Sequence, residues 1–218
     1  MFFSSDEKEI DVLQNISFNA AYLSHITNKV TLIPTGFYDE KHQNELFSII
    51  FGKTNHPIKT NLISELDIIT VFESSTSLQR KYSEIYCQTF CWLEYLLYTI
   101  KKNHLTKNVF IHLEKTFFHI AFFQNKQLKF YNTFETNHWK DIIYFILYVY
   151  NRLNLSQTEV SLIYSGSIKN NEKLFSALKE YIATVQPISI PDFINYPADF
   201  PKAGVLAHIP LFAQYLCE

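Results

Sequence analysis

The sequence predicts an α/β protein with a substantial core, and three observations carry this prediction. The chain has 218 residues, of which 47% are hydrophobic and only 18% are charged, so it can bury a large apolar core. Aromatic residues make up 17% of the chain, and this excludes the disordered class, which is poor in aromatic residues. Short β-rich runs alternate with segments in which apolar residues recur at helical spacing, as in α/β domains.

The second half of the chain has the clearest pattern of elements. Three β-rich runs are separated by polar turns at Glu114-Lys115 and Asn125-Lys126, and together they predict a meander of adjacent strands. The three predicted strands are 108–113, 116–123 and 127–133.

A helix, a strand and a second helix are predicted after the meander. Apolar residues lie on two sides of the predicted helix 139–153, so we expect protein to cover both sides. A fourth strand is expected at 160–164, ending at a Ser-Gly-Ser turn, and a helix at 172–183. The tail 186–201 holds four of the seven prolines and predicts an extended chain.

The first half and the C-terminus have weaker patterns. No internal repeat or glycine-rich linker divides the chain, which has only four glycines. The elements expected in these parts are a strand at 29–34, a helix at 39–51, a hairpin or two short strands at 62–73, a long helix at 77–102 and a last helix at 204–216.

The predicted order β-β-β-α-β-α is that of the repeating half of RNase-H-like and actin-like ATPase folds. Residues 128–182 resemble a bacterial family of uncharacterised proteins, a domain of unknown function, with a degenerate actin-like ATPase fold. The residues that carry the resemblance are Tyr131-Asn132-Thr133-Phe134, Asp141-Ile142-Ile143-Tyr144-Phe145, Ser165-Gly166-Ser167, the closing Leu216-Cys217-Glu218 and, in the first half, TLIPTGFYDE at 31–40.

The resemblance implies two related RNase-H-like halves. The first half, 1–104, would include the long connecting helix and be abbreviated, because family members carry a further hairpin segment near their start. The second half, 105–218, would hold the β-β-β-α-β-α unit and the C-terminal helix.

Nucleotide chemistry is poorly supported at the places where this fold would need it. Actin-like ATPases bind phosphates at glycine-containing hairpin turns between their halves, but the turn 112–116 reads His-Leu-Glu-Lys-Thr. The chain has neither a GxxxxGK[ST] nor a GxGxxG motif. We therefore expect a degenerate nucleotide site and no cofactor. The candidate binding residues of the cleft between the halves are Glu114, Lys115, Asn132, Thr133, Ser165, Gly166 and Ser167.

Two histidines and two cysteines have spacings that could also suggest a metal. If Glu114-Lys115 forms the hairpin turn, His112 and His119 lie diagonally on one sheet face. No third ligand is visible, so we interpret them as part of an aromatic face. Cys87 and Cys91 are one helical turn apart without a second cysteine pair, which indicates buried free thiols. No metal site is predicted.

The function class that these observations favour is a non-catalytic scaffold or protein-interaction protein, and the protein partner could be a second copy of the chain. The alternatives are a nucleotide-binding protein with weak or no hydrolysis and, third, a metal-dependent hydrolase. A net charge of −2 and only two arginines argue against a nucleic-acid partner. The longest apolar run has nine residues, too short to span a membrane. With three cysteines and no signal-peptide pattern, we expect a cytoplasmic protein.

Overall fold

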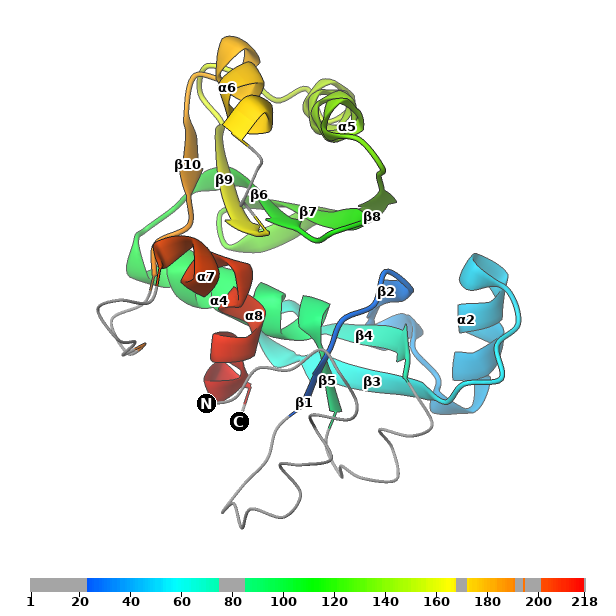
Figure 1. The fold of residues 1–218 in the computed structure, drawn as a ribbon. Helices are drawn as coiled ribbons and strands as arrows, with labels where there is room; N and C mark the ends of the chain where they lie inside the picture. Colours follow the sequence, from blue (N-terminus) through cyan, green and yellow to red (C-terminus); the bar gives the residue numbers. More distant parts are fainter. Residues whose placement is uncertain (1–22, 75–84, 168–171, 191–193, 195–200, 218) are drawn as a thin grey trace.

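The structure is a computed structural model that describes residues 23–74, 85–167, 172–190, 194 and 201–217. A five-stranded mixed sheet forms the second half of the chain, with strand order β10-β9-β6-β7-β8 (Figure 1). The predicted meander is confirmed, since β6, β7 and β8 pair as antiparallel neighbours, and the predicted strand 160–164 corresponds to β9. The strands are β6 (Lys107–Leu113), β7 (Phe117–Gln124), β8 (Gln127–Glu135), β9 (Ser161–Gly166) and β10 (Val185–Pro187).

Helices cover both faces of this sheet. The predicted helices 139–153 and 172–183 correspond to α5 (Trp139–Arg152) and α6 (Glu172–Tyr181), which lie together above one face (Figure 1). Their apolar residues and the strand residues of that face form one buried cluster. The other face packs on α4 (Gln88–Lys102) and forms a second cluster. Covering both faces explains why β6 and β7 are apolar nearly throughout.

A smaller antiparallel sheet, β2-β4-β3, lies on the other side of α4. The predicted strand 29–34 and helix 39–51 are confirmed, and the region predicted as a hairpin folds into β3 and β4, although β3 begins before residue 62. A separate parallel pair joins β1 to β5. The elements are β1 (Leu23–His25), β2 (Val30–Pro34), η1 (Thr35–Phe37), η2 (Glu40–His42), α2 (Gln43–Phe51), β3 (Ile58–Ile63), η3 (Ser64–Leu66), β4 (Ile68–Glu73) and β5 (Ile85–Cys87).

The prediction of one long helix over 77–102 is wrong. Residues 77–84 lie outside the described residues, and 85–87 form β5 rather than helix. The side chain of Asn61 on β3 holds this strand, because its Oδ1 accepts from the Cys87 N–H and its Nδ2 donates to the Ile85 carbonyl. The helix then begins at Gln88, where the Cys87 Sγ accepts a hydrogen bond from the Phe90 N–H.

The last predicted helix, 204–216, is broken into three short segments: α7 (Lys202–Ala207), α8 (Ile209–Phe212) and η4 (Ala213–Leu216). Pro210 explains the break, because proline lacks the N–H that would continue the helix and restricts the residue before it. Ile209 and Ala213 are buried against α4, and Leu206 of α7, which packs on β9, belongs to the same buried cluster. The division into halves 1–104 and 105–218 stays a prediction.

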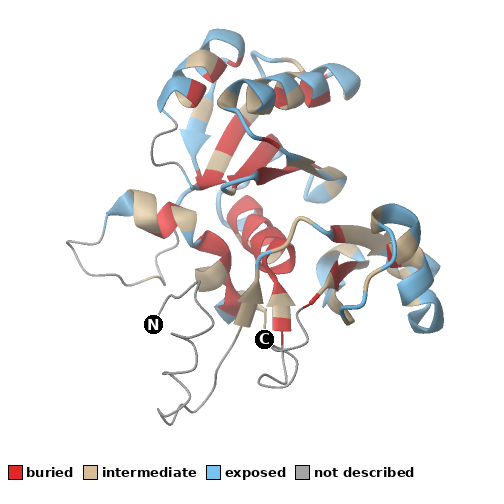
Figure 2. Cartoon of the chain, turned by 45° about the vertical axis from the view of Figure 1, so that its right-hand side comes forward, coloured by how far each residue is buried: buried red, intermediate tan, exposed pale blue. Residues whose placement is uncertain are grey.

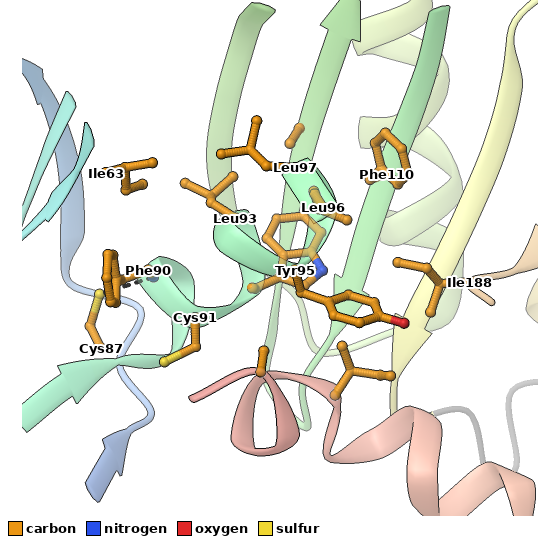
Figure 3. Packing of buried hydrophobic residues seen from close by; sticks show 14 of the residues in the cluster. Ile63, Cys87, Phe90, Cys91, Leu93, Tyr95, Leu96, Leu97, Phe110 and Ile188 are labelled. Carbon is orange, nitrogen blue, oxygen red and sulfur yellow. Dashed lines mark hydrogen bonds between the residues drawn. The ribbon is translucent and has the colours of Figure 1, made fainter. Parts of the chain in front are cut away.

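The most enclosed element is α4. Eleven of its fifteen residues are buried, so the helix is apolar nearly all round and is packed by protein on all sides (Figure 2). Figure 3 shows Leu93, Leu96 and Tyr95 of α4 between Ile63 of the small sheet and Phe110 of the large one. In the part of the chain that the structure describes, no helix has the length and apolar character needed to cross a membrane.

Leu96→Ala tests the dependence of the fold on this helix. Leu96 is fully buried between the two sheets, so truncation should lower the free energy of unfolding by about 2–5 kcal/mol. The matched control Leu62→Ala removes a side chain that is 52% exposed and should cost less than about 1 kcal/mol. Equal losses in urea denaturation of the two variants would contradict the burial of α4.

Candidate functional site

A row of four polar side chains crosses the five-stranded sheet on the face that packs against α4. Ser165 of β9, His112 of β6, His119 of β7 and Thr133 of β8 are direct neighbours in register. Both histidines and Ser165 are buried. We refer to these four residues as the polar row.

The two histidines share a face, as predicted, but they lie directly opposite each other rather than diagonally. The hairpin turns at Lys115-Thr116, because the Glu114 N–H donates to the Phe117 carbonyl and thus continues the strand pairing by one residue. Their rings stack with centroids 6.5 Å apart. Phe117 packs edge-on against His119 at 5.2 Å, in agreement with the aromatic-face interpretation.

One end of the polar row is joined to a buried hydrogen-bond network. His112 Nδ1 lies 2.8 Å from Ser165 Oγ, and His112 Nε2 lies 3.1 Å from Glu114 Oε1. Gln88, the first residue of α4, donates from Nε2 to the same Glu114 oxygen at 2.5 Å. Burial alone would raise the pKa of Glu114, but hydrogen bonds from His112 and Gln88 outweigh burial and hold that pKa below its usual range. The Glu114 carboxylate is thus directed into the protein.

The other end of the polar row is neutral. His119 Nδ1 lies 2.8 Å from Thr133 Oγ1 and 3.0 Å from the Tyr131 hydroxyl, which also lies 3.1 Å from Thr89 Oγ1. Burial, with the neighbouring His112 in support, lowers the pKa of His119 to about 3. Burial also raises the pKa of Tyr131 above its usual range. His119 is therefore uncharged at neutral pH.

Trp92 of α4 covers the centre of the polar row. Its ring lies 5.9 Å from that of His112 and 6.0 Å from that of His119. Three buried polar atoms near this contact, Gln88 Oε1, Trp92 Nε1 and His119 Nε2, have no hydrogen-bond partner among the described residues. Unpartnered buried groups cost free energy, so the row weakens the fold relative to an apolar core.

Gly166 closes the end of β9 against β6. Its φ is +97°, and a Cβ at this position would lie 2.2 Å from the Leu113 carbonyl oxygen. The next N–H, that of Ser167, donates to the same carbonyl at 2.7 Å. Glycine is thus needed here for the approach of two strands, whether or not a ligand binds nearby.

An open groove lies between the small sheet and the edge of the large sheet. It has a volume of about 370 Å³, and a second hollow of about 300 Å³ continues it along β8. The main groove is lined mostly by residues of β2, α2 and β8, with one residue before β2 and one of β4: Asn28, Val30, Thr31, Leu32, Pro34, Ile50, Phe51, Ile68, Leu128, Lys129, Phe130, Tyr131, Asn132 and Thr133.

Comparison with protein families identifies the chain. The family described as "Protein of unknown function (DUF3822)" matches residues 8–185, which is most of the sequence. The chain belongs to the DUF3822 family. The predicted resemblance to a family of unknown function is therefore confirmed. A search of curated proteins found no match to this DUF3822 chain.

Several solved structures resemble the DUF3822 chain, and two of them are informative about its fold. One is a Bacteroides thetaiotaomicron protein of unknown function with an actin-like ATPase fold, which is 22% identical with a TM-score of 0.80 over 97% of this chain and 81% of that one. The other belongs to the PilM-PilN type IV pilus biogenesis complex, with 13% identity and a TM-score of 0.56 over 94% of this chain and 81% of that one. The actin-like ATPase fold predicted from the sequence is confirmed.

The structure divides the seven predicted cleft residues of the DUF3822 chain into three groups. Glu114, Thr133, Ser165 and Gly166 belong to the polar row, its network or its closing turn. Lys115, at the tip of the β6–β7 hairpin, and Ser167 are exposed. Asn132 faces the opposite side of the sheet from Thr133, because it pairs with Ile120 of the α5–α6 cluster.

The residues that sequence reasoning missed all come from α4 and its surroundings. Three residues of α4 contact the polar row or its hydrogen-bonded neighbours: Gln88, Thr89 and Trp92. His208, between α7 and α8, is close enough for its charge to lower the pKa of Glu114. The adjacent polar residues Gln88 and Thr89, within an otherwise apolar run, were the one available signal. Among the described residues, no three metal-binding side chains gather in one place.

Gly166→Ala should destabilise the protein by at least about 2 kcal/mol, because alanine would adopt a positive φ and contact the Leu113 backbone. Gly36→Ala is the matched control, since no atom lies within 4 Å of the added Cβ, and its effect should stay within about 0.5 kcal/mol. Chemical denaturation measures both. A neutral Gly166→Ala would contradict the observed approach of β9 to β6.

His119→Phe should make the free energy of unfolding depend less on pH below pH 7. His119 has a pKa of about 3 when folded and about 6.5 when unfolded. Between these values the unfolded chain binds more protons, so stability falls as pH falls. From pH 7 to 4.5, wild type should lose about 2–3 kcal/mol more than His119→Phe. The control His104→Asn, at an exposed histidine, should leave the pH dependence of the free energy of unfolding unchanged. Identical slopes for wild type and His119→Phe would show that His119 titrates normally in the folded protein.

Proposed function

We propose that this DUF3822 protein is a non-catalytic scaffold or protein-interaction protein on a degenerate actin-like ATPase fold. The observation that carries the proposal is that polar side chains predicted to line the cleft are hydrogen-bonded to other residues of the protein. Glu114 is hydrogen-bonded to Gln88 and His112, and Ser165 to His112. A phosphate or Mg²⁺ ion would have to break this network to gain those ligands.

Exposed apolar side chains support an interaction role. Around α2 and the small sheet, Phe37 is 82% exposed, Ile49 80%, Ile50 54% and Leu62 52%. Such a group on one region of a small protein is typical of a surface that contacts another molecule. The partner would be another protein or a second copy of this chain.

Two further features are consistent with this proposal. One of the similar folds was solved as part of a complex named for two proteins, PilM and PilN, so a fold of this kind can belong to a protein assembly. The three cysteines Cys87, Cys91 and Cys217 are all free thiols, which supports a reducing, cytoplasmic location.

Thermal unfolding with nucleotides tests the proposal. ATP, ADP and GTP at up to millimolar concentration, with and without Mg²⁺, should leave the Tm unchanged. A nucleotide at one hundred times its Kd would stabilise the protein by about 2.7 kcal/mol, which is a rise of several degrees for a chain of this size. Sodium triphosphate with Mg²⁺ controls for ionic effects.

A rise in Tm that increases with nucleotide concentration, beyond the triphosphate control, would overturn the proposal. It would favour the alternative, a nucleotide-binding protein with weak or no hydrolysis. A single-turnover assay for phosphate release would then separate binding from hydrolysis.

A further inference from the structure

The groove lies where two sheet edges face each other without pairing. β8 is the edge strand of the five-stranded sheet, and β2 is an edge strand of the three-stranded sheet. Residues of both strands line the groove. An edge strand presents backbone N–H and C=O groups that have no partner within its sheet. The groove thus has hydrogen-bonding backbone on two opposite walls.

The two edge strands run in opposite directions across the groove. At one end, Asn28, two residues before β2, donates from Nδ2 to Oε1 of Glu135, the last residue of β8, at 2.6 Å. At the other end, Ile68 is paired with Pro34, the last residue of β2, and lines the groove together with Leu128 near the start of β8. A third strand between them would be parallel to one and antiparallel to the other.

The apolar side chains of β8 are already packed, so this strand offers the groove its backbone edge and its exposed polar side chains Lys129 and Asn132. Leu128 and Tyr131 pack on the α4 cluster, and Phe130 and Phe134 on the α5–α6 cluster. A ligand without polar side chains for Lys129 and Asn132 can bind this wall through main-chain groups. An extended polypeptide is the ligand class that does so, by adding a strand to a sheet edge.

The remaining groove walls indicate what side chains such a polypeptide would carry. Ile50 and Phe51 of α2 offer an apolar wall, and Ile50 is 54% exposed. Among the described residues that line the main groove, Lys129 is the one that carries a charge. Its Nζ donates to Gln127 Oε1, and it forms no ion pair with a described carboxylate. A carboxylate on the ligand would complement this charge.

We propose that the groove binds an extended segment of a partner protein, which adds a strand to the edge of β8. Its apolar side chains pack on Ile50 and Phe51, and an acidic residue lies near Lys129. The groove volume of about 370 Å³ falls within the usual range of binding pockets. This inference rests on the proposed interaction function and specifies the partner of the same surface.

A random twelve-residue peptide library displayed on phage, selected against the whole chain, tests the proposal. Selected peptides should share alternating apolar residues and an Asp or Glu. A fluorescent synthetic copy of one should bind with a Kd that rises at least tenfold in Ile50→Asp and in Lys129→Glu. N-methylation of alternate backbone amides should abolish binding in one of the two possible phases, because only one set faces β8.

Matched controls lie outside the groove. Ile49→Asp changes a neighbouring α2 residue that is 80% exposed and does not line the groove, and Lys179→Glu reverses an exposed charge on α6. Both should keep the Kd within twofold of wild type. Circular dichroism should show that all four variants are folded.

Several results would overturn the inference. These are a library without enriched peptides, peptides with a helical spacing of apolar residues, binding that withstands both N-methylation phases, or equal effects of groove and control variants. Concentration-dependent dimers lost in Ile50→Asp would assign the groove to a second copy instead. The proposed function is tested separately from this inference. If the Tm does not change with nucleotides, the proposed function holds even when the peptide experiment fails; if the Tm rises with nucleotide concentration, the proposed function is wrong whatever the peptide experiment shows.

Discussion

The burial of α4 between the two sheets is the interaction on which the rest of the structure depends. The helix buries residues on every side, so it cannot stand at a surface, and both sheets and the C-terminal helices must close around it. This enclosure places Trp92 over the polar row. It also brings Gln88, at the start of the helix, to the carboxylate of Glu114.

The polar row shows how polar side chains on the inner face of a sheet can hydrogen-bond to one another within the protein. Each of these groups has a hydrogen-bond partner within the protein: Glu114 has Gln88, Ser165 has His112, and Thr133 has His119. The short β6–β7 hairpin allows the contacts of Glu114, because it positions this residue one place beyond the end of β6. From there the Glu114 side chain reaches back to His112 and Gln88. The open groove lies instead at the edge of β8, where both apolar and polar residues line it.

The sequence predicted the second half well because each of its elements has a strong local pattern. The meander, α5, β9 and α6 are specified by the alternation or helical spacing of apolar residues, and β7 and β8 join at a tight turn. The start of α4 could not be predicted in this way. Residues 85–87 become a strand through Asn61, which is distant in sequence, and no local pattern reports such a contact. The prediction that His112 and His119 lie diagonally was wrong for a related reason, because turns of similar composition allow more than one strand register.

The direct adjacency of the four residues of the polar row has a consequence for the evolution of the family. A change at His112 alone would remove one hydrogen-bond partner from Ser165 and one from Glu114, and a change at His119 would remove one from Thr133 and one from Tyr131, at a cost in free energy. Replacement of several members at once by apolar residues removes that penalty. Across DUF3822 sequences, these positions should therefore vary as a group, either polar together or apolar together, and such correlated variation would mark the row as one inherited unit.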